Sequence, residues 1–509
     1  MKKVLITLAV AIFLVMAVSS AYAFQATQGP TELLYYDASK AYNGYTLFRG
    51  LGGMETELGT AWLIDMLGNV VHSWPDVVTN PQLLPDGHLL YSRPARAVGQ
   101  STFIREQDWD GNLVREWTIP ANRPDFAAFH HDVKRIHNKE LDENTLIANV
   151  YFTYTAEQAL ADGAYPSKAK NTNVGGIVEF DLDGNIIWEW HQSDHYIQDY
   201  DATKNNYVGE GKTIADYPGK FDMNWGGGLT TNFNSNDYNE TLDQILVNSA
   251  TTSEIWILDH AGTFIPGDPE GSRALAASDA GDIIYRWGNP SVYGAGDPPY
   301  YEYGSYGNGH MQLFSTHDAQ FIKEGLPGAG HFLVFDNNSS RPGGGGWSRL
   351  VEINPYDGPM ANGVYVWEAD AGYGAANLSN LVVWQWHEKL YSGWSRGFYS
   401  GHISGVERQP NGNTLGCAGE DGHFVEVTYG DAANGVLPEI VWEYINPDTY
   451  THGIQKWITI EMYNQVYRAH RYAPDYSAFV GRDLTPKGKI TDRAGIEAIQ
   501  DKLQNFLAQ

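Results

Sequence analysis

The chain of 509 residues is poor in cysteine, in basic residues and in long apolar runs. Cys417 is its only cysteine, so an intramolecular disulfide and a cysteine-based metal site are both excluded. Lysine and arginine number 33 against 61 aspartates and glutamates, which gives a formal net charge of −28. A field of that sign repels nucleic acids and anionic lipids, so we expect neither as a partner.

The one long apolar run lies at the start of the chain. Residues 1–23 have the pattern of a secretory signal, with two lysines before an apolar run over 4–18. That run is short for a transmembrane helix, and a small-x-small cleavage site ends at Ala23. We therefore predict a mature chain from Phe24 that is periplasmic or extracellular and is not inserted in a membrane.

Aromatic residues and glycine are abundant, at 13% of the chain and 55 copies, which suits a protein of many strands and turns. One phrase recurs six times: a strand, a turn of Asp, Gly and Asn, and a second strand ending in tryptophan. Its clearest copy is Ile177–Trp190 (IVEFDLDGNIIWEW). A repeated strand phrase is typical of a β-propeller or a solenoid. The copies end at Trp74, Trp117, Trp190, Trp287, Trp367 and Trp442.

A second hairpin precedes every phrase except the first, and two hairpins make the four strands of a propeller blade. We therefore predict an all-β, six-bladed β-propeller over residues 24–480, with long loops on one face. Residues 481–509 are predicted to form a tail with a short amphipathic helix over 493–509. The predicted blades are 44–74, 82–117, 130–190, 225–287, 317–367 and 402–442, and the predicted loops are 191–224, 288–316 and 372–400.

Histidines stand near the start of three predicted blades: His131, His317 and His402. The first strand of a blade lines the channel, so these imidazoles are expected to face the axis. A single histidine there is more often structural, but three in one register favour a functional site. Blade 4 carries glycines 226–228 at the place taken as equivalent.

The loops that join the two hairpins of a blade supply further polar groups, Arg341 in blade 5 and His423 in blade 6. A guanidinium is a planar fork for oxyanions, and a histidine serves as nucleophile or general base. Together they predict a site for a tetrahedral anion. Asn337 and Trp225 are predicted to contact the substrate as well, although a tryptophan in such a loop is more often packing.

Three stretches give the chain its clearest resemblance: THDAQFI (316–322), GHFLVFDNNSSR (330–341) and NTLGCAGEDGHFVEV (413–427). With the blade phrases, they resemble the bacterial arylsulfate sulfotransferase family over nearly the whole mature chain. The resemblance implies a periplasmic six-bladed propeller that moves a sulfuryl group from an aryl sulfate to a phenol. It also implies a sulfohistidine intermediate, with no phosphoadenosine phosphosulfate and no other cofactor or metal.

Carried over by the resemblance, His423 takes the sulfuryl group, and His317 and Arg341 hold the transferring oxygens. His131, His402, Asn337 and Trp225 are the expected substrate-binding residues.

One residue of the family's pattern is missing, because its blade-4 histidine falls on Gly227 and the asparagine that follows falls on Leu229. Two explanations stay open: either His131, His195 or His402 compensates from a neighbouring blade, or the substrate differs from the family's.

Two alternatives stay open. The loss at Gly227 favours a non-catalytic secreted propeller that binds a ligand or a protein partner. A sulfatase or lyase that reuses the channel histidines is the other. The oligomeric state is not predicted.

Overall fold

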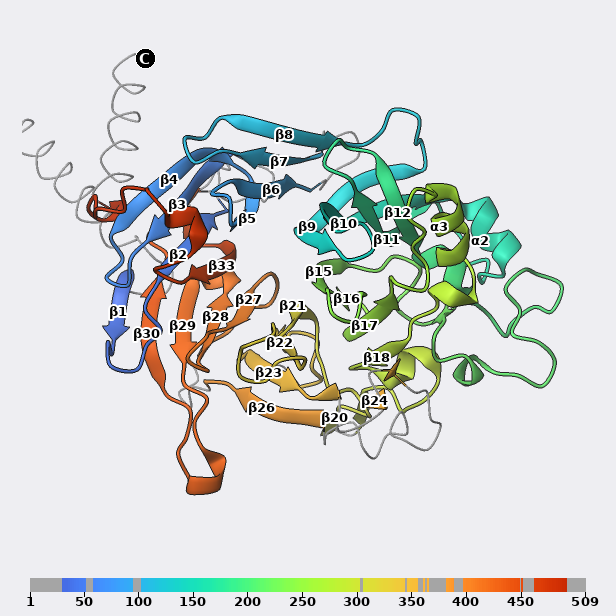
Figure 1. Ribbon diagram of the computed structural model, residues 1–509. Coiled ribbons are helices and arrows are strands. Elements are labelled where there is room, and N and C mark those ends of the chain that lie inside the picture. Colours follow the sequence, from blue (N-terminus) through green and yellow to red (C-terminus); the bar gives the residue numbers. More distant parts are fainter. Residues whose placement is uncertain are drawn as a thin grey trace, which may run out of the picture.

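The computed structural model confirms the all-β, six-bladed propeller: small antiparallel sheets stand in a ring about a common axis (Figure 1). The predicted signal segment 1–23 and the predicted helix over 493–509 lie outside the described residues. Among the residues that are described, no helix is long and apolar enough to cross a membrane. The structure describes residues 30–51, 58–94, 102–302, 305–343, 346–355, 360–361, 364–365, 381–388, 397–448, 450–451 and 462–491.

Blades 2, 3 and 4 are each built from four consecutive strands, with the first strand innermost. The inner strand of blade 4 begins at Phe233, so the predicted start at residue 225 was too early. Blade 2 contains β5 (Thr79–Leu83), β6 (Leu89–Arg93), β7 (Phe103–Gln107) and β8 (Leu113–Thr118); blade 3 contains β9 (Phe126–Asn138), β10 (Glu143–Tyr154), β11 (Thr172–Phe180) and β12 (Ile186–His191); blade 4 contains β15 (Phe233–Asn239), β16 (Gln244–Ser249), β17 (Glu254–Asp259) and β18 (Tyr285–Trp287).

Blade 5 has the same order but a different outer strand from the one predicted. Leu350 pairs with Trp386, just as Ile177 pairs with Trp190 in blade 3. The fifth phrase therefore ends at Trp386, and the predicted end at Trp367, a residue outside the described part, was wrong. The segment predicted as a loop over 372–400 holds this outer strand. The strands are β21 (Thr316–Phe321), β22 (Phe332–Asp336), β23 (Arg349–Ile353) and β26 (Val382–Trp386).

The two ends of the described chain complete blades 1 and 6. The inner strand of blade 1 is β33, which pairs with β2 although it comes from the other end of the chain. The outer edge of blade 6 gains β1 as a fifth strand. Blade 1 contains β33 (Val466–Tyr472), β2 (Tyr45–Gly50), β3 (Gly59–Ile64) and β4 (Val70–Val77); blade 6 contains β27 (Gly405–Arg408), β28 (Thr414–Ala418), β29 (His423–Val427), β30 (Ile440–Ile445) and β1 (Glu32–Tyr36).

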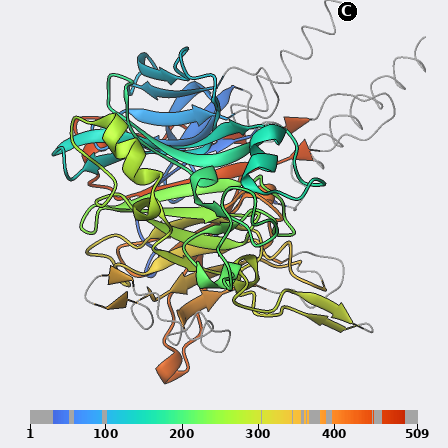
Figure 2. The ribbon, with the colours of Figure 1, turned by 90° about the vertical axis from the view of Figure 1, so that its right-hand side faces the viewer.

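Shorter elements lie in the connections outside the blade sheets. They are helices α2 (Ala156–Asp162) and α3 (Pro269–Ala276); the 3-10 turns η1 (Gln192–His195), η2 (Ile214–Asp216), η3 (Asp279–Gly281), η4 (Pro290–Tyr293), η7 (Gly419–Asp421), η8 (Ala432–Asn434) and η9 (Ser477–Phe479); and the strand pairs β13 (Tyr196–Ile197) with β14 (Phe221–Asp222), β19 (Tyr300–Glu302) with β20 (Ser305–Gly307), β24 (Met360–Ala361) with β25 (Val364–Tyr365) and β31 (Tyr450–Thr451) with β32 (Met462–Tyr463). Helices α2 and α3 stand on the outer side of the ring beside blade 3 (Figure 1), and Figure 2 shows the ring from the side.

The repeated turn of Asp, Gly and Asn is held by the aspartate at its start. In blade 3, Asp181 accepts hydrogen bonds from the backbone of Asp183 at 3.0 Å and of Asn185 at 2.8 Å. Gly184 takes a φ of 93°, which a side chain would strain. The tryptophan that follows then packs against the next blade: Trp190 is 1% exposed, and its indole N–H donates to the carbonyl of Gly281 at 2.7 Å.

A buried glutamate on the third strand of four blades binds a basic group of the following blade. Glu426 lies 3.0 Å from Arg471, and Glu179 lies 2.9 Å from His260. We call these contacts the interblade clasps. Because both partners are buried, loss of either leaves an unpaired charge inside the protein, a cost of about 3–5 kcal/mol. The four clasps are Glu106–Arg135, Glu179–His260, Glu352–Arg408 and Glu426–Arg471.

A further buried arginine crosses the axis itself. Arg468 on β33 lies 2.9 Å from Asp132 of blade 3 and 3.2 Å from Asp318 of blade 5. It also donates to the carbonyl of Asn234 in blade 4 at 2.7 Å. Burial opposes a charge at this position, but the two carboxylates raise the pKa of Arg468 above its ordinary value. One side chain therefore joins four blades.

Candidate functional site

The six inner strands run in the same direction along the axis, so the ring has two distinct mouths. The N-terminal ends of the inner strands surround what we call the upper mouth, with His131 and His317. Their C-terminal ends surround the lower mouth, with Glu407 and His470. The long loops over 191–224 and 288–316 connect outer strands to the next inner strands, and so lie at the upper end, as the prediction of one loop-rich face requires.

His317 and Asn337 brace the loop over residues 397–404 at the upper mouth. The amide of Asn337 donates to the carbonyls of Ser400 at 2.9 Å and Ile403 at 3.0 Å. Nε2 of His317 accepts the backbone N–H of Ile403 at 3.2 Å, so Nδ1 carries the proton and donates to Oδ1 of Asn337 at 2.7 Å. Both side chains are buried and their polar atoms are engaged. In this geometry they hold the loop, and the predicted contacts with a substrate would require these bonds to be exchanged.

His423 begins β29 directly after a turn that needs glycine. Gly422 has a φ of 58°, and a Cβ there would lie 2.1 Å from the carbonyl oxygen of Asn464. Nε2 of His423 lies 2.8 Å from Oε1 of Glu443 on β30, and its ring contacts that of Phe398 edge to face at 5.6 Å. The carboxylate accepts from Nε2–H, which leaves the lone pair on Nδ1. Among the described residues, Nδ1 has no hydrogen-bond partner.

Arg341 is held by aromatic rings. Its guanidinium lies 5.4 Å from the ring of Phe314 and 5.4 Å from that of Trp347. The nearby carboxylate of Asp336 is engaged by Arg349 at 2.8 Å. Burial, followed by the charge of Arg349, lowers the pKa of Arg341 from its ordinary value. In the described part of the chain no carboxylate pairs with Arg341, so this cation is available to an anionic ligand.

The loop over 397–404 connects Arg341 with His423. Trp347, which flanks Arg341, is followed by Ser348, and Ser348 N–H donates to the carbonyl of Phe398 at 2.8 Å. The ring of Phe398 contacts His423. Blades 5 and 6 thus present both groups on the same part of the upper mouth.

Two more predicted residues belong to this mouth. The side chain of His402 is exposed in the loop, while its carbonyl accepts from the hydroxyl of Ser400 at 2.5 Å. His131 in blade 3 has a φ of 56°, and its ring stacks on that of Tyr467 at 5.7 Å. Tyr467 packs in one apolar cluster with Ile403 of the loop. His131 is therefore linked to the site through Tyr467.

Trp225 and Gly227 lie in a turn before the inner strand of blade 4. Trp225 packs against the core between blades 4 and 5, and its carbonyl accepts from Lys168. A Cβ at Gly227 would lie 1.8 Å from the indole of Trp225. The inner strand of blade 3, β9, has a bulge that contains His131, and the inner strand of blade 4, β15, has its bulge at Asn234. Asn234, and not Gly227, is therefore the blade-4 residue that corresponds to His131. The equivalence drawn between the glycines and the histidines of other blades was therefore wrong.

His195 is not a replacement for a blade-4 histidine. Nδ1 lies 2.8 Å from Asp282, Nε2 lies 3.0 Å from the carbonyl of Ala276, and the side chain is fully buried. These bonds tie η1 to the C-terminal end of α3. The expectation that His195 compensates at the site was wrong.

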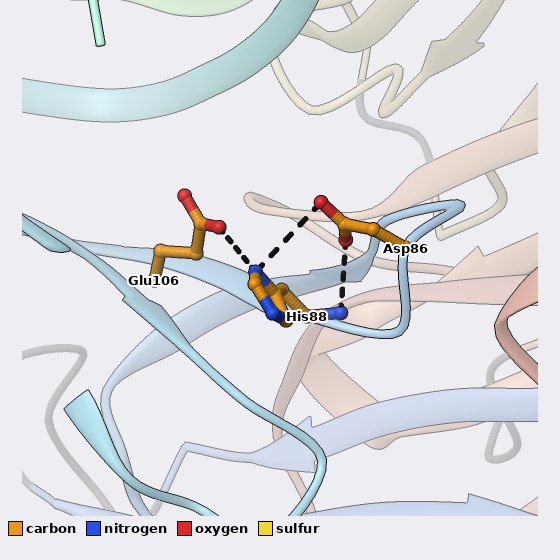
Figure 3. Close-up of side chains that lie close together, drawn as sticks. All are labelled: Asp86, His88 and Glu106. Carbon is orange, nitrogen blue, oxygen red and sulfur yellow. Dashed lines mark hydrogen bonds and ion pairs between the residues drawn. The ribbon is translucent and has the colours of Figure 1, made fainter. Parts of the chain in front are cut away.

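One group of side chains has the composition of a metal site: Asp86, His88 and Glu106 (Figure 3). His88 Nδ1 lies 2.5 Å from Glu106 and 3.7 Å from Asp86. Glu106 also accepts from Arg115 at 3.0 Å and from Arg135. Two guanidinium groups already supply the positive charge, and Glu106–Arg135 is one of the interblade clasps. We therefore assign this group to the structure of the ring.

The sequence interpretation missed Glu443, Phe314 and Phe398. Glu443 had a usable signal, because it lies on the strand that follows His423 in the last tryptophan phrase. The interblade clasps had one too: a glutamate recurs at the same place in four phrases, at 106, 179, 352 and 426.

No protein-family model matches the chain, and no curated protein matches it. Solved structures that resemble it include a protein of unknown function from Bacteroides caccae (9% identity, 84% of this chain and 98% of that one, TM-score 0.37). A second is the β-propeller domain of Cps50 (Swd1) from Myceliophteria thermophila (11% identity, 81% of this chain and 89% of that one, TM-score 0.35). A third is the periplasmic gluconolactonase PpgL of Pseudomonas aeruginosa (10% identity, 79% of this chain and 96% of that one, TM-score 0.33). Similarity this low carries no inference about activity.

Proposed function

We propose that this propeller transfers a sulfuryl group from an aryl sulfate to a phenol at the upper mouth, with His423 as the group that carries it. The observation that supports this most is the pairing of His423 with Glu443, near a guanidinium that has no carboxylate partner in the described part of the chain. The resemblance of residues 413–427 and 330–341 to arylsulfate sulfotransferases supports the same reading.

Glu443 keeps His423 in the tautomer that a nucleophile needs. It accepts the proton of Nε2, so the lone pair is on Nδ1. In the first step Nδ1 attacks sulfur, an N–S bond forms, and the S–O bond to the aryl group breaks with its electron pair on the leaving phenolate. In the second step the oxygen of an acceptor phenol attacks sulfur, the N–S bond breaks, and the phenolic proton passes to solvent.

Arg341 binds the sulfate oxygens. Its planar fork suits an oxyanion, and the charge on those oxygens is retained throughout the transfer. The rings of Phe314 and Trp347 each lie 5.4 Å from the guanidinium, so they restrict its movement before the ligand arrives. Positioning and charge stabilisation supply most of the catalysis in group transfers of this kind.

The second candidate is a propeller that binds an anionic aromatic ligand at the same place without turnover. It is favoured by His317 and Asn337, whose polar atoms are engaged with the loop over 397–404. On that reading Arg341 supplies the affinity, and His423 has no chemical role.

The test is release of nitrophenol from 4-nitrophenyl sulfate by the full chain, with and without a phenol acceptor. Transfer requires release that depends on the acceptor and falls by about 10²-fold or more in His423→Gln. Glu443→Gln is expected to reduce the rate less. His137→Gln, a histidine at the lower mouth, is the matched control and keeps the wild-type rate.

The other outcomes separate the alternatives. Equal release with and without phenol, lost in His423→Gln, assigns a hydrolase and contradicts transfer. No release, together with binding of 4-nitrophenyl sulfate that is lost in Arg341→Ala, assigns the binding protein.

A further inference from the structure

The lower mouth opens into a cavity of about 950 Å³ to which the inner strands of all six blades contribute. It lies at the opposite end of the ring from His423 and Arg341. Arg468 and its two aspartates cross the axis between the two mouths, and Asp318 also lines the cavity. The volume is in the range of small-molecule sites. This cavity is independent of the function proposed for the upper mouth.

Most charges on its walls are neutralised by the protein itself. Lys134 lies 2.9 Å from Asp237, and His137 lies 3.0 Å from Glu240. Arg135 and Arg408 are engaged by their clasp glutamates. A ligand with a strong net charge therefore gains little here, because most of the wall charges already have their partners.

At the deep end of the cavity a histidine lone pair faces a carboxyl group. The amide nitrogen of Asn80 donates to Asp132 at 2.8 Å, so its oxygen is turned to His470 and accepts from Nε2 at 3.4 Å. Nδ1 of His470 then carries a lone pair, and it lies 3.9 Å from Oε2 of Glu407, which also accepts the backbone N–H of Arg471 at 3.1 Å. The distance of 3.9 Å is too long for a direct hydrogen bond. Among the described residues, no donor bridges the two atoms.

Below about pH 7 both groups are mainly neutral in this environment. Burial, with the charges of Arg468, Lys134 and Lys323, lowers the pKa of His470 to about 3. Burial raises the pKa of Glu407 to about 7. A cation is disfavoured as the bridging group, since Lys134 and Lys323 both line the cavity. Neutral Glu407 carries a proton, so the matching group accepts from its O–H and donates to Nδ1 of His470, and an uncharged hydroxyl does both.

The remaining walls suit the same class of ligand. Among the described residues Lys323 has no ion-pair partner, and its ammonium donates to hydroxyl oxygens. The rings of Tyr472 and Tyr476 lie 4.9 Å apart on the wall of the cavity and offer flat apolar faces. Hydroxyl groups that both donate and accept, on a skeleton with apolar C–H faces, are the chemistry of a saccharide.

We propose that the lower mouth is a second binding site, which takes a neutral saccharide and bridges His470 Nδ1 and Glu407 with one ligand hydroxyl.

The test is isothermal titration calorimetry of the full chain with maltotriose and glucose at up to about 10 mM. Glucosamine and glucuronate are the charged counterparts of the same ring. The proposal predicts saturable binding of at least one neutral sugar, and binding of both charged sugars that is about ten-fold weaker or worse. Saturable binding of neither neutral sugar, or preference for a charged one, overturns it.

Variants locate the binding site. Glu407→Ala removes the carboxyl group that the ligand hydroxyl contacts, so affinity for the neutral sugar falls about ten-fold. Lys323→Met lowers the affinity without changing Glu407 or His470. Glu157→Ala, the same substitution on the exposed face of α2, is the control and keeps wild-type affinity. Unchanged affinity in Lys323→Met and in a folded Glu407→Ala overturns the assignment.

Discussion

Nη1 of Arg468 lies 2.9 Å from Oδ2 of Asp132, although the two residues are 336 positions apart in the sequence. The arginine comes from the strand that completes blade 1, and the aspartate lines blade 3. The contact therefore ties the closure of the ring to its centre.

Replacing Arg468 by methionine is predicted to destabilise the fold strongly. The change leaves Asp132 and Asp318 buried without their cation, at a cost of about 3–5 kcal/mol. Urea denaturation followed by tryptophan fluorescence measures the loss. Arg115→Met removes a partly exposed arginine from Glu106, which keeps Arg135, and should cost under about 1 kcal/mol. Equal losses of unfolding free energy in the two variants would contradict the prediction that Arg468 contributes more to stability than Arg115.

Glu407 is predicted to make the protein less stable as the pH rises. Its folded pKa of about 7 lies above its ordinary 4.5, so between those values the folded state holds a proton that the unfolded state has lost. The resulting loss in the free energy of unfolding grows from about pH 4.5 to pH 7 and is on the order of 3 kcal/mol above pH 7. The charged groups facing this carboxyl are Lys323, Arg471 and Asp318, with neutral His470 beside it.

Glu407→Gln should therefore gain stability relative to wild type at pH 8.5 and gain little at pH 4.5. The measurement is the difference in free energy of unfolding between variant and wild type at the two pH values. Since all other titrating groups are shared, they cancel in that difference. A difference that does not change with pH would show that Glu407 titrates normally.

Gly227→His, which reproduces the histidine implied by the family resemblance, is predicted to harm the protein and not to help it. A Cβ at this position lies 1.8 Å from the ring of Trp225, so the indole must leave its packing against the core. We expect a loss of about 1–3 kcal/mol and no gain in rate. Gly226→His is the matched control, because nothing lies within 4 Å of a Cβ there. A faster enzyme with Trp225 undisturbed would refute this prediction.

Arg341→Ala is predicted to lower kcat/KM for 4-nitrophenyl sulfate by about 10²–10³-fold under the proposed function. Arg341→Lys should recover only part of this loss, because an ammonium lacks the planar fork and fits less well between Phe314 and Trp347. Steady-state kinetics of the three proteins test it. If the lysine variant were as active as wild type, the positive charge alone, and not the planar guanidinium, would account for the effect of Arg341 on kcat/KM.

The blade count was predictable because each tryptophan keeps one register, as in the pairing of Ile177 with Trp190. Blade 5 misled the prediction because two similar sequence segments, one ending at Trp367 and one at Trp386, follow Leu350. Sequence alone does not say which of them pairs with it. The inner strand of blade 1 was missed for a different reason: β33 pairs with β2 from the far end of the chain, and local patterns do not encode such a partner.

The candidate site was predictable only residue by residue. His423 and Arg341 were predictable because each lies in a loop that joins the two hairpins of its blade, and such loops can be recognised in the sequence. The bond from His317 to Asn337 depends on how the loop over 397–404 folds across blades 5 and 6, which periodicity does not reveal. Glu443 contacts His423 diagonally between neighbouring strands, a relation that appears only once the register is fixed.

The position of β33 also sets the order of events during biosynthesis. Until residues 466–472 have been made, β2 presents an open edge and Asp132 and Asp318 lack their cation. An open strand edge and unpaired buried charges favour aggregation and proteolysis. A chain interrupted before its last strand is therefore expected to be degraded, so that protease resistance distinguishes finished copies of the protein from unfinished ones.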